Sequence, residues 1–290
     1  MTTDNIEVAE PRLNRLRLAS GIELHYVSHG QGEPVILVHG GMGDLQSWSA
    51  QIRAFAHAYR VISYSRRYSF PNRNAFRGDN HSVFIEADDL AALLQALRLP
   101  SVHLVGTSYG AFAALAYAVE YPRTVRSLVL AEPPVHQWAR GSSDGDAAFR
   151  EFIDNVWTPA TRAFELGLAR NAMRLLFDGM GGQSLFDTSV PALVASVMRN
   201  ARSMEALTRS AGAFPDLSRA RVRLLNVRTL LVSGQYSIAL HKLVNAELAR
   251  MLPNCEQAIV PDAGHSSPRE NPVAFNAVVL EFMARQRQRA

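Results

Sequence analysis

The residues best suited to chemistry lie in a Gly-x-Ser-x-Gly motif, in which Gly106 and Gly110 flank Ser108. The apolar residues 102–105 lead directly into this motif, and the helical sequence 109–121 follows it at once. A serine at such a corner must adopt a strained backbone, and larger residues in place of the two glycines would collide with the neighbouring elements. Because the corner exposes the hydroxyl to a base and to a substrate carbonyl, the context predicts that Ser108 is a nucleophile.

A serine hydroxyl attacks well only when a base removes its proton, and His265 is the best candidate for that base. It follows the loop 261–264, directly after an apolar strand, from which an imidazole could reach Ser108. Three other histidines, His81, His136 and His241, lie in no motif and remain open as alternatives.

Apolar strands alternate with amphipathic helices through most of the chain, which is typical of an α/β fold. We therefore predict a mostly parallel twisted sheet with helices on both faces. The predicted strands cover residues 13–18, 23–28, 35–38, 61–64, 102–105, 125–130, 229–233 and 257–260. The predicted helices of this core cover residues 82–97, 109–121, 240–251 and 272–286.

The alternation stops after the sixth strand. Helical patterns without strands follow, at residues 147–157, 159–177, 190–199 and 204–211. The sequence therefore predicts a core formed by residues 1–132 and 219–290, with a helical cap inserted at 133–218.

The composition excludes several classes of function. Lysine and arginine number 30 against 26 acids, and they are scattered rather than gathered into a stripe with aromatic residues, so we expect no nucleic-acid partner. One cysteine excludes an intramolecular disulfide and thiolate metal clusters. No metal-ligand spacing and no Gly-x-Gly-x-x-Gly opening is present, so we expect neither a metal nor another cofactor. The polar residues 1–14 show no secretory signal, and no apolar run reaches transmembrane length, so a cytoplasmic location is expected.

Three motifs occur in a characteristic order. His39-Gly40-Gly41-Met42-Gly43 follows the third predicted strand, the Ser108 motif follows the fifth, and Asp262-Ala263-Gly264-His265 follows the last. With these motifs the chain resembles the α/β-hydrolase superfamily, in its capped esterase-like branch. The resemblance covers nearly the whole chain outside the insertion. It implies a serine, an acid and a histidine that act together in that chain order.

The acid is where the sequence departs from this resemblance. The family often places an aspartate three residues past the glycine after the seventh strand, but here that position is Ser237. Some branches take the acid from the end of the sixth strand, where this chain has Glu132. We therefore predict that Glu132 orients His265 and stabilises its protonated form. The alternative is that Glu132 pairs with an arginine and that Asp262, or no acid, serves the histidine.

The resemblance also implies an oxyanion hole made of main-chain amides. One amide is that of Tyr109, and the other is that of Gly41, with Met42 as the neighbouring candidate. Arg66 and Arg67 follow the fourth strand, where the family more often has a different pattern. They would either form ion pairs with Asp88 or Asp89 or bind a substrate carboxylate.

These residues predict a serine hydrolase that cleaves a carboxylic ester through an acyl-enzyme. Its partner would be a small molecule, an apolar acyl or aryl ester bound beneath the cap. Within the fold, a carbon–carbon bond hydrolase of ring-cleavage products and a cofactor-free perhydrolase remain alternatives. A non-catalytic ligand receptor on the same scaffold is the alternative from another class. Epoxide hydrolases and haloalkane dehalogenases are disfavoured, because those relatives have aspartate where this chain has Ser108.

Overall fold

The computed structural model describes residues 12–76, 81–182 and 184–287, and the statements below concern those residues. Most of the polar segment 1–14 lies outside them. The strands within this part of the chain are β1 (Asn14–Arg17), β2 (Glu23–His29), β3 (Pro34–Val38), β4 (Arg60–Tyr64), β5 (Val102–Thr107), β6 (Val125–Ala131), β7 (Thr229–Gly234) and β8 (Cys255–Val260). They form one eight-stranded sheet in the order β1-β2-β4-β3-β5-β6-β7-β8. Strand β2 pairs antiparallel with both β1 and β4, and every other pairing is parallel. The predicted fold class is therefore confirmed.

The helices among the described residues are α1 (Ser49–Phe55), α2 (Val83–Ala96), α3 (Tyr109–Glu120), α4 (Ser143–Phe152), α5 (Thr158–Glu165), α6 (Ala169–Gly181), α7 (Pro191–Met198), α8 (Ala201–Thr208), α9 (Arg219–Arg223), α10 (Ala239–Met251), α11 (Ser267–Glu270) and α12 (Pro272–Arg287). Four short helical turns accompany them, at η1 (Leu45–Trp48), η2 (Pro122–Thr124), η3 (His136–Ala139) and η4 (Ile153–Trp157).

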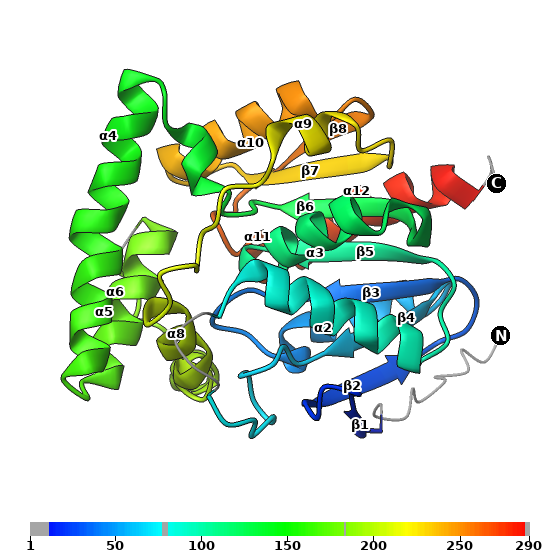
Figure 1. Cartoon of the computed structure of the whole chain (residues 1–290), viewed down its shortest axis with the longest axis horizontal. Coiled ribbons are helices and arrows are strands. Elements are labelled where there is room, and N and C mark those ends of the chain that lie inside the picture. The colour runs from blue at the N-terminus through cyan, green and yellow to red at the C-terminus, as the bar shows by residue number, and fades with distance from the viewer. Residues whose placement is uncertain (1–11, 77–80, 183, 288–290) are drawn as a thin grey trace, which may run out of the picture.

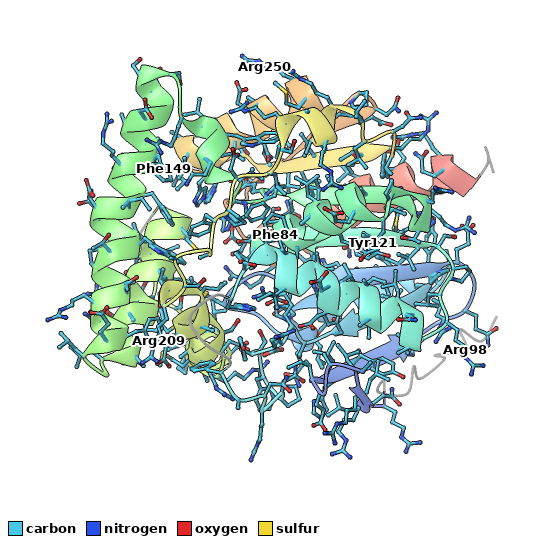
Figure 2. All side chains as sticks on the ribbon, in the orientation of Figure 1. Phe84, Arg98, Tyr121, Phe149, Arg209 and Arg250 are labelled. Carbon is cyan, nitrogen blue, oxygen red and sulfur yellow. The ribbon has the colours of Figure 1, made fainter. Side chains whose placement is uncertain are left out.

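Alternate residues of the central strands face two separate cores. Ile36 and Val38 of β3 pack on the side covered by α2, α3 and α10, whereas Val35 and Leu37 pack on the side covered by α1 and α12. The two-residue period of a strand produces this division, and near-continuous apolar strands are expected where both faces of a sheet are covered. Figure 2 shows side chains filling the space around the sheet, with Arg98, Arg209 and Arg250 at three separate edges of the molecule.

The segment between β6 and β7 is helical. Its helices α4, α5, α6 and α8 stand together at one end of the sheet, on the left of Figure 1. The predicted helix at 159–177 is wrong, because the chain forms α5 and α6 there instead of one helix. The break comes at Gly167, whose φ of 74° is left-handed and ends a helix readily. Among the described residues, no helix is both long and apolar enough to cross a bilayer.

A buried carboxylate ties this helical segment to the loop after β3. Asp44 is fully buried, and its carboxylate accepts hydrogen bonds from Arg199 at 2.7 and 3.0 Å and from the side-chain amide of Asn200 at 2.8 Å. The same carboxylate caps η1 by accepting a bond from the amide of Gln46 at 2.9 Å. Because a buried charge is tolerated only when it is paired, these contacts fix the segment against the loop 40–43.

The start of α3 packs so closely against the end of β3 that no room is left for a side chain at Gly110. A Cβ there would lie 2.2 Å from the carbonyl oxygen of Val38 and 2.3 Å from that of His39. The helix can begin this close to the sheet only because residue 110 has no side chain.

Gly110→Ala should therefore lower the free energy of unfolding by about 1–3 kcal/mol, the usual cost of overpacking a core. Urea unfolding of the purified variant would measure this. Gly181→Ala is the matched control, since its Cβ would meet nothing within 4 Å. Equal stability of the two variants would show that the corner relaxes without cost.

Candidate active site

Ser108 lies at the corner between β5 and α3 in a left-handed backbone conformation, with φ 51° and ψ −128°. Its amide donates to the carbonyl of Ala131 at 2.7 Å, which holds the corner against the end of β6. A Cβ at Gly106 would lie 2.6 Å from the Cα of Ala111, so the turn is tight on both sides of the serine. A non-glycine residue in this conformation is strained, and such strain is common where a side chain must be presented for function.

The side chains of Ser108, His265 and Glu132 form one chain of hydrogen bonds. Ser108 Oγ lies 3.0 Å from Nε2 of His265, and Nδ1 of His265 lies 2.7 Å from Oε2 of Glu132. With Nδ1–H donating to the carboxylate, Nε2 carries the lone pair that faces the serine hydroxyl. The structure thus brings together the three residues singled out from the sequence, from the ends of β5, β6 and β8.

Glu132 is buried, with 2% of its surface exposed, and its second oxygen also has partners. Oε1 accepts from the amide of Gly234 at 2.9 Å and from the hydroxyl of Ser237. Burial by itself would raise the pKa of Glu132, but the hydrogen bond and charge of His265, aided by His241 and Ser237, hold the pKa at about 2. The carboxylate is therefore ionised at neutral pH and can stabilise a protonated His265.

Asp262, the alternative acid, is exposed and bonds to residues other than His265. Its carboxylate accepts a hydrogen bond from the hydroxyl of Tyr236 at 3.4 Å. Its main-chain amide donates to the side-chain oxygen of Gln235 at 3.0 Å. Its φ of 51° helps the chain turn out of β8 toward His265.

The main-chain amides expected to form an oxyanion hole lie beside Ser108. Tyr109 is the first residue of α3, and an amide in the first turn of a helix has no acceptor within that helix. Gly41 and Met42 line the same cavity as Ser108. A Cβ at Gly41 would lie 2.6 Å from the sulfur of Met204, so the loop runs closely beneath α8.

His39 fixes the turn before these glycines. Its Nδ1 lies 2.8 Å from the carbonyl of Gly40, and its Nε2 accepts from the amide of Arg66 at 2.9 Å. Burial, together with the nearby charge of Arg66, lowers the pKa of His39 to about 4, so this ring remains neutral.

Arg66 and Arg67 form ion pairs with acidic side chains of α2. Arg66 is fully buried, forms an ion pair with Glu86 at 3.1 Å and donates to the Gly40 carbonyl at 3.4 Å. Arg67 binds Asp89 through two hydrogen bonds of 2.7 Å. Neither arginine is among the described residues that line the two cavities at Ser108.

Two cavities meet at Ser108. The larger one, which we call the chamber, has a volume of about 670 Å³ and lies between the strand ends and the helical segment. Apolar residues of α6, α7 and the loop between them line its outer wall: Phe177, Met180, Leu185, Leu193 and Val197. The smaller one, which we call the inner cavity, has a volume of about 20 Å³. Both cavities reach Gly41, Ser108 and His265.

A further histidine, which lies in no sequence motif, contacts His265. The ring of His241, in α10, stacks on the ring of His265 with centroids 4.1 Å apart and an angle of 14°. Glu132, His241 and His265 bring possible metal-ligand atoms within 4.8 Å of one another. However, imidazole lone pairs lie in the ring planes, and two nearly parallel stacked rings do not aim theirs at a shared point. Both nitrogens of His265 are also already hydrogen-bonded, so the arrangement suits proton transfer better than metal binding.

The buried pair of Glu86 and Arg66 makes stability depend on pH. Burial alone would raise the pKa of Glu86, but Arg66 and His81 outweigh it and lower the pKa to about 2. The stabilisation is therefore fully present above about pH 4.5, the ordinary pKa of the group, and is lost as the pH falls toward 2. Glu86→Gln should be less stable at pH 6 by about 3–5 kcal/mol, because Arg66 stays buried without its partner.

Urea unfolding at pH 6, 4.5 and 3 would test this expectation. The difference in stability between the natural protein and Glu86→Gln should shrink toward pH 3. Glu281→Gln, which changes an exposed acid on α12, is the control. A difference that stays constant across this range would contradict the assignment.

Comparison with known proteins identifies the family to which the chain belongs. The chain is 27% identical to 2-hydroxy-6-oxononadienedioate/2-hydroxy-6-oxononatrienedioate hydrolase 2 of Pseudomonas putida, over 98% of this chain and 99% of that protein. It is also 27% identical to 2-hydroxy-6-oxo-6-phenylhexa-2,4-dienoate hydrolase of Burkholderia cepacia, over 91% of this chain and 92% of that protein. A thermophilic esterase from Thermogutta terrifontis has a similar fold, with a TM-score of 0.73 and 24% identity over 95% of this chain and 99% of that one. The family model described as alpha/beta hydrolase fold matches residues 33–272, well over half of the chain, so the protein belongs to the α/β-hydrolase family.

Proposed function

We propose that this hydrolase cleaves carboxylic esters through an acyl-enzyme, with Ser108 as the nucleophile, His265 as the base and Glu132 as the acid. The observation that carries the proposal is the continuous set of hydrogen bonds from Ser108 Oγ through His265 to Glu132 Oε2. A serine, an imidazole and a buried carboxylate in this arrangement can transfer a proton at neutral pH.

In the first half of the reaction, Ser108 Oγ bonds to the ester carbonyl carbon while His265 Nε2 takes the hydroxyl proton. The carbonyl oxygen becomes negatively charged, and the amides of Tyr109 and Gly41, or that of the neighbouring Met42, donate hydrogen bonds to it. When the tetrahedral intermediate collapses, His265 returns the proton to the departing alcohol. Glu132 stabilises the imidazolium between these two transfers.

In the second half, a water molecule repeats the chemistry. His265 takes its proton as the oxygen attacks the acyl carbon, and the proton then passes to Ser108 Oγ as the carboxylic acid leaves. Water must reach the acyl-enzyme, and the chamber, which is the larger cavity, offers this access.

The lining of the chamber supports a neutral, largely apolar substrate. Arg269 is the one cationic side chain among the described residues that line it, and it pairs with Glu270 at 3.0 Å. Asp262 adds a further acid to this rim. An ester without a free carboxylate fits such a lining. We infer that residues 133–218 act as the cap, because α6 and α7 supply the apolar wall.

Carbon–carbon bond hydrolysis is the second candidate. It is favoured by the names of the two relatives, a hydrolase of a dienedioate and a trienedioate and a hydrolase of a dienoate. The same serine and histidine could serve it. A dienoate carries a carboxylate, which a cationic side chain would bind. Arg66 and Arg67 are already paired with Glu86 and Asp89. Because of this pairing, we rank ester hydrolysis above carbon–carbon bond hydrolysis.

Ser108→Ala should lower kcat/KM for a p-nitrophenyl ester by about 10⁴–10⁶-fold, because the nucleophile is lost while the fold is kept. Release of p-nitrophenol gives the rate, and circular dichroism checks the fold. Ser49→Ala, which removes an exposed hydroxyl, is the control. A carboxylated dienone assayed beside the ester distinguishes the two candidates: faster turnover of the dienone would reverse their order.

Glu132→Gln should lower kcat by about 10²–10⁴-fold, because a neutral amide cannot stabilise the imidazolium. The comparison variant is Asp262→Asn, and a larger loss there would transfer the role of acid to Asp262. Ser237 lies beside Glu132 at the position where the resemblance places an aspartate. In a Glu132→Ala background, Ser237→Asp should therefore restore kcat by about tenfold or more. No recovery in a folded double variant would show that a carboxylate at position 237 cannot serve His265.

A further inference from the structure

The inner cavity contains two histidines that the proposed reaction does not use. His136 comes from η3 and His241 from α10, and both line the inner cavity together with Ser108. Their exposed fractions are 2% and 3%. The rest of the wall is mostly apolar and includes Phe152, Trp157 and Phe214.

The rings of these histidines lie in a row that begins at His265. His241 stacks on His265 at 4.1 Å, and the centroid of His136 lies 6.1 Å from that of His241 at an angle of 30°. Phe152 and Phe214 contact His136 from other directions, with ring centroids 4.8 and 4.7 Å away. Both rings are therefore buried among aromatic neighbours.

Three nitrogens of this row lack a hydrogen-bond partner among the described residues. They are Nδ1 and Nε2 of His136 and Nε2 of His241. Buried polar atoms in folded proteins are nearly always paired, so unpaired ones at the wall of a cavity next to a nucleophile indicate a ligand group that pairs with them.

Both rings are neutral, which limits what that group can be. Burial, reinforced by the nearby His265, lowers the pKa of His136 to about 3 and that of His241 well below its ordinary value. The main chain of Met180 is a hydrogen-bond partner of His241, so its Nδ1–H donates there and its Nε2 is left as an acceptor. A neutral acceptor suits a hydroxyl hydrogen and repels the oxygens of a carboxylate.

We propose that the inner cavity is an acyl subsite for short hydroxy acids, in which His241 Nε2, together with His136, binds the hydroxyl of the acyl group. This inference rests on the proposed function. The acyl group remains on Ser108 while the alcohol leaves and water enters, so the larger chamber serves those two and the inner cavity holds the acyl chain. A volume of about 20 Å³, little more than one water molecule needs, restricts the part of the chain inside the cavity to about one or two atoms.

Pairs of esters that differ only by a methyl group replaced by a hydroxyl test the subsite directly. One pair is methyl propanoate and methyl glycolate, and the other is methyl butanoate and methyl 3-hydroxypropanoate. The release of acid gives kcat/KM, and the rates of alkaline hydrolysis correct for intrinsic reactivity. In the natural protein we expect a corrected preference of about tenfold or more for the hydroxy ester in at least one pair.

The variants His136→Phe and His241→Phe keep an aromatic ring but remove the nitrogens. The corrected preference should fall to about one or below, whatever happens to the absolute rate, because a methyl group then fits the apolar wall as well as a hydroxyl does. His136→Gln retains a donor and an acceptor, and it should keep more of the preference than His136→Phe does.

The outcomes separate this inference from the proposed function. Turnover of the propanoate and butanoate esters without any preference for hydroxyl overturns the subsite and leaves the esterase proposal intact. A preference that survives in both phenylalanine variants also overturns the subsite. If the folded natural protein turns over none of the four esters, nor any p-nitrophenyl ester, the proposed function fails and the subsite fails with it.

Discussion

The buried carboxylate of Glu132 is the interaction on which the rest of the site depends. It accepts hydrogen bonds from His265, Gly234 and Ser237, which follow or end strands β7 and β8. A charge in this environment is costly unless all its partners are present. The ends of three neighbouring strands are thereby fixed around one anion, and the orientation of the imidazole follows from that arrangement. Glu132 also adopts a φ of 50°, so its position is maintained against backbone strain as well.

Most of the architecture could be predicted from the sequence because its determinants are local. Apolar runs define the strands, and the glycines around Ser108 define the corner. The boundary between α5 and α6 is harder to predict. Residues on both sides of Gly167 follow a helical pattern, and a single glycine is often tolerated within a helix. The chain turns at Gly167, whose φ of 74° is left-handed, and α5 and α6 then pack against each other.

Side-chain roles that arise from long-range contacts could not be predicted from the sequence. Arg66 and Arg67 had two interpretations, and only the position of α2 shows that Glu86 and Asp89 bind them. His241 lies on a helix with no motif, and its importance comes from a ring 24 positions further along the chain, at His265. By contrast, the departure at Ser237 was visible from the sequence, because a serine in place of the expected aspartate requires the acid to come from elsewhere.

The contact between Asp44 and the helical segment limits how the two parts of the chain can be exchanged. Its carboxylate is fully buried and is neutralised by Arg199, with help from Asn200, 155 and 156 positions later. A chimera that joins this sheet to the helices of a relative would bury an uncompensated anion next to the glycine loop, unless the donor brings a matching arginine and amide. Successful recombination in this enzyme therefore requires residues 44, 199 and 200 to be inherited as a set.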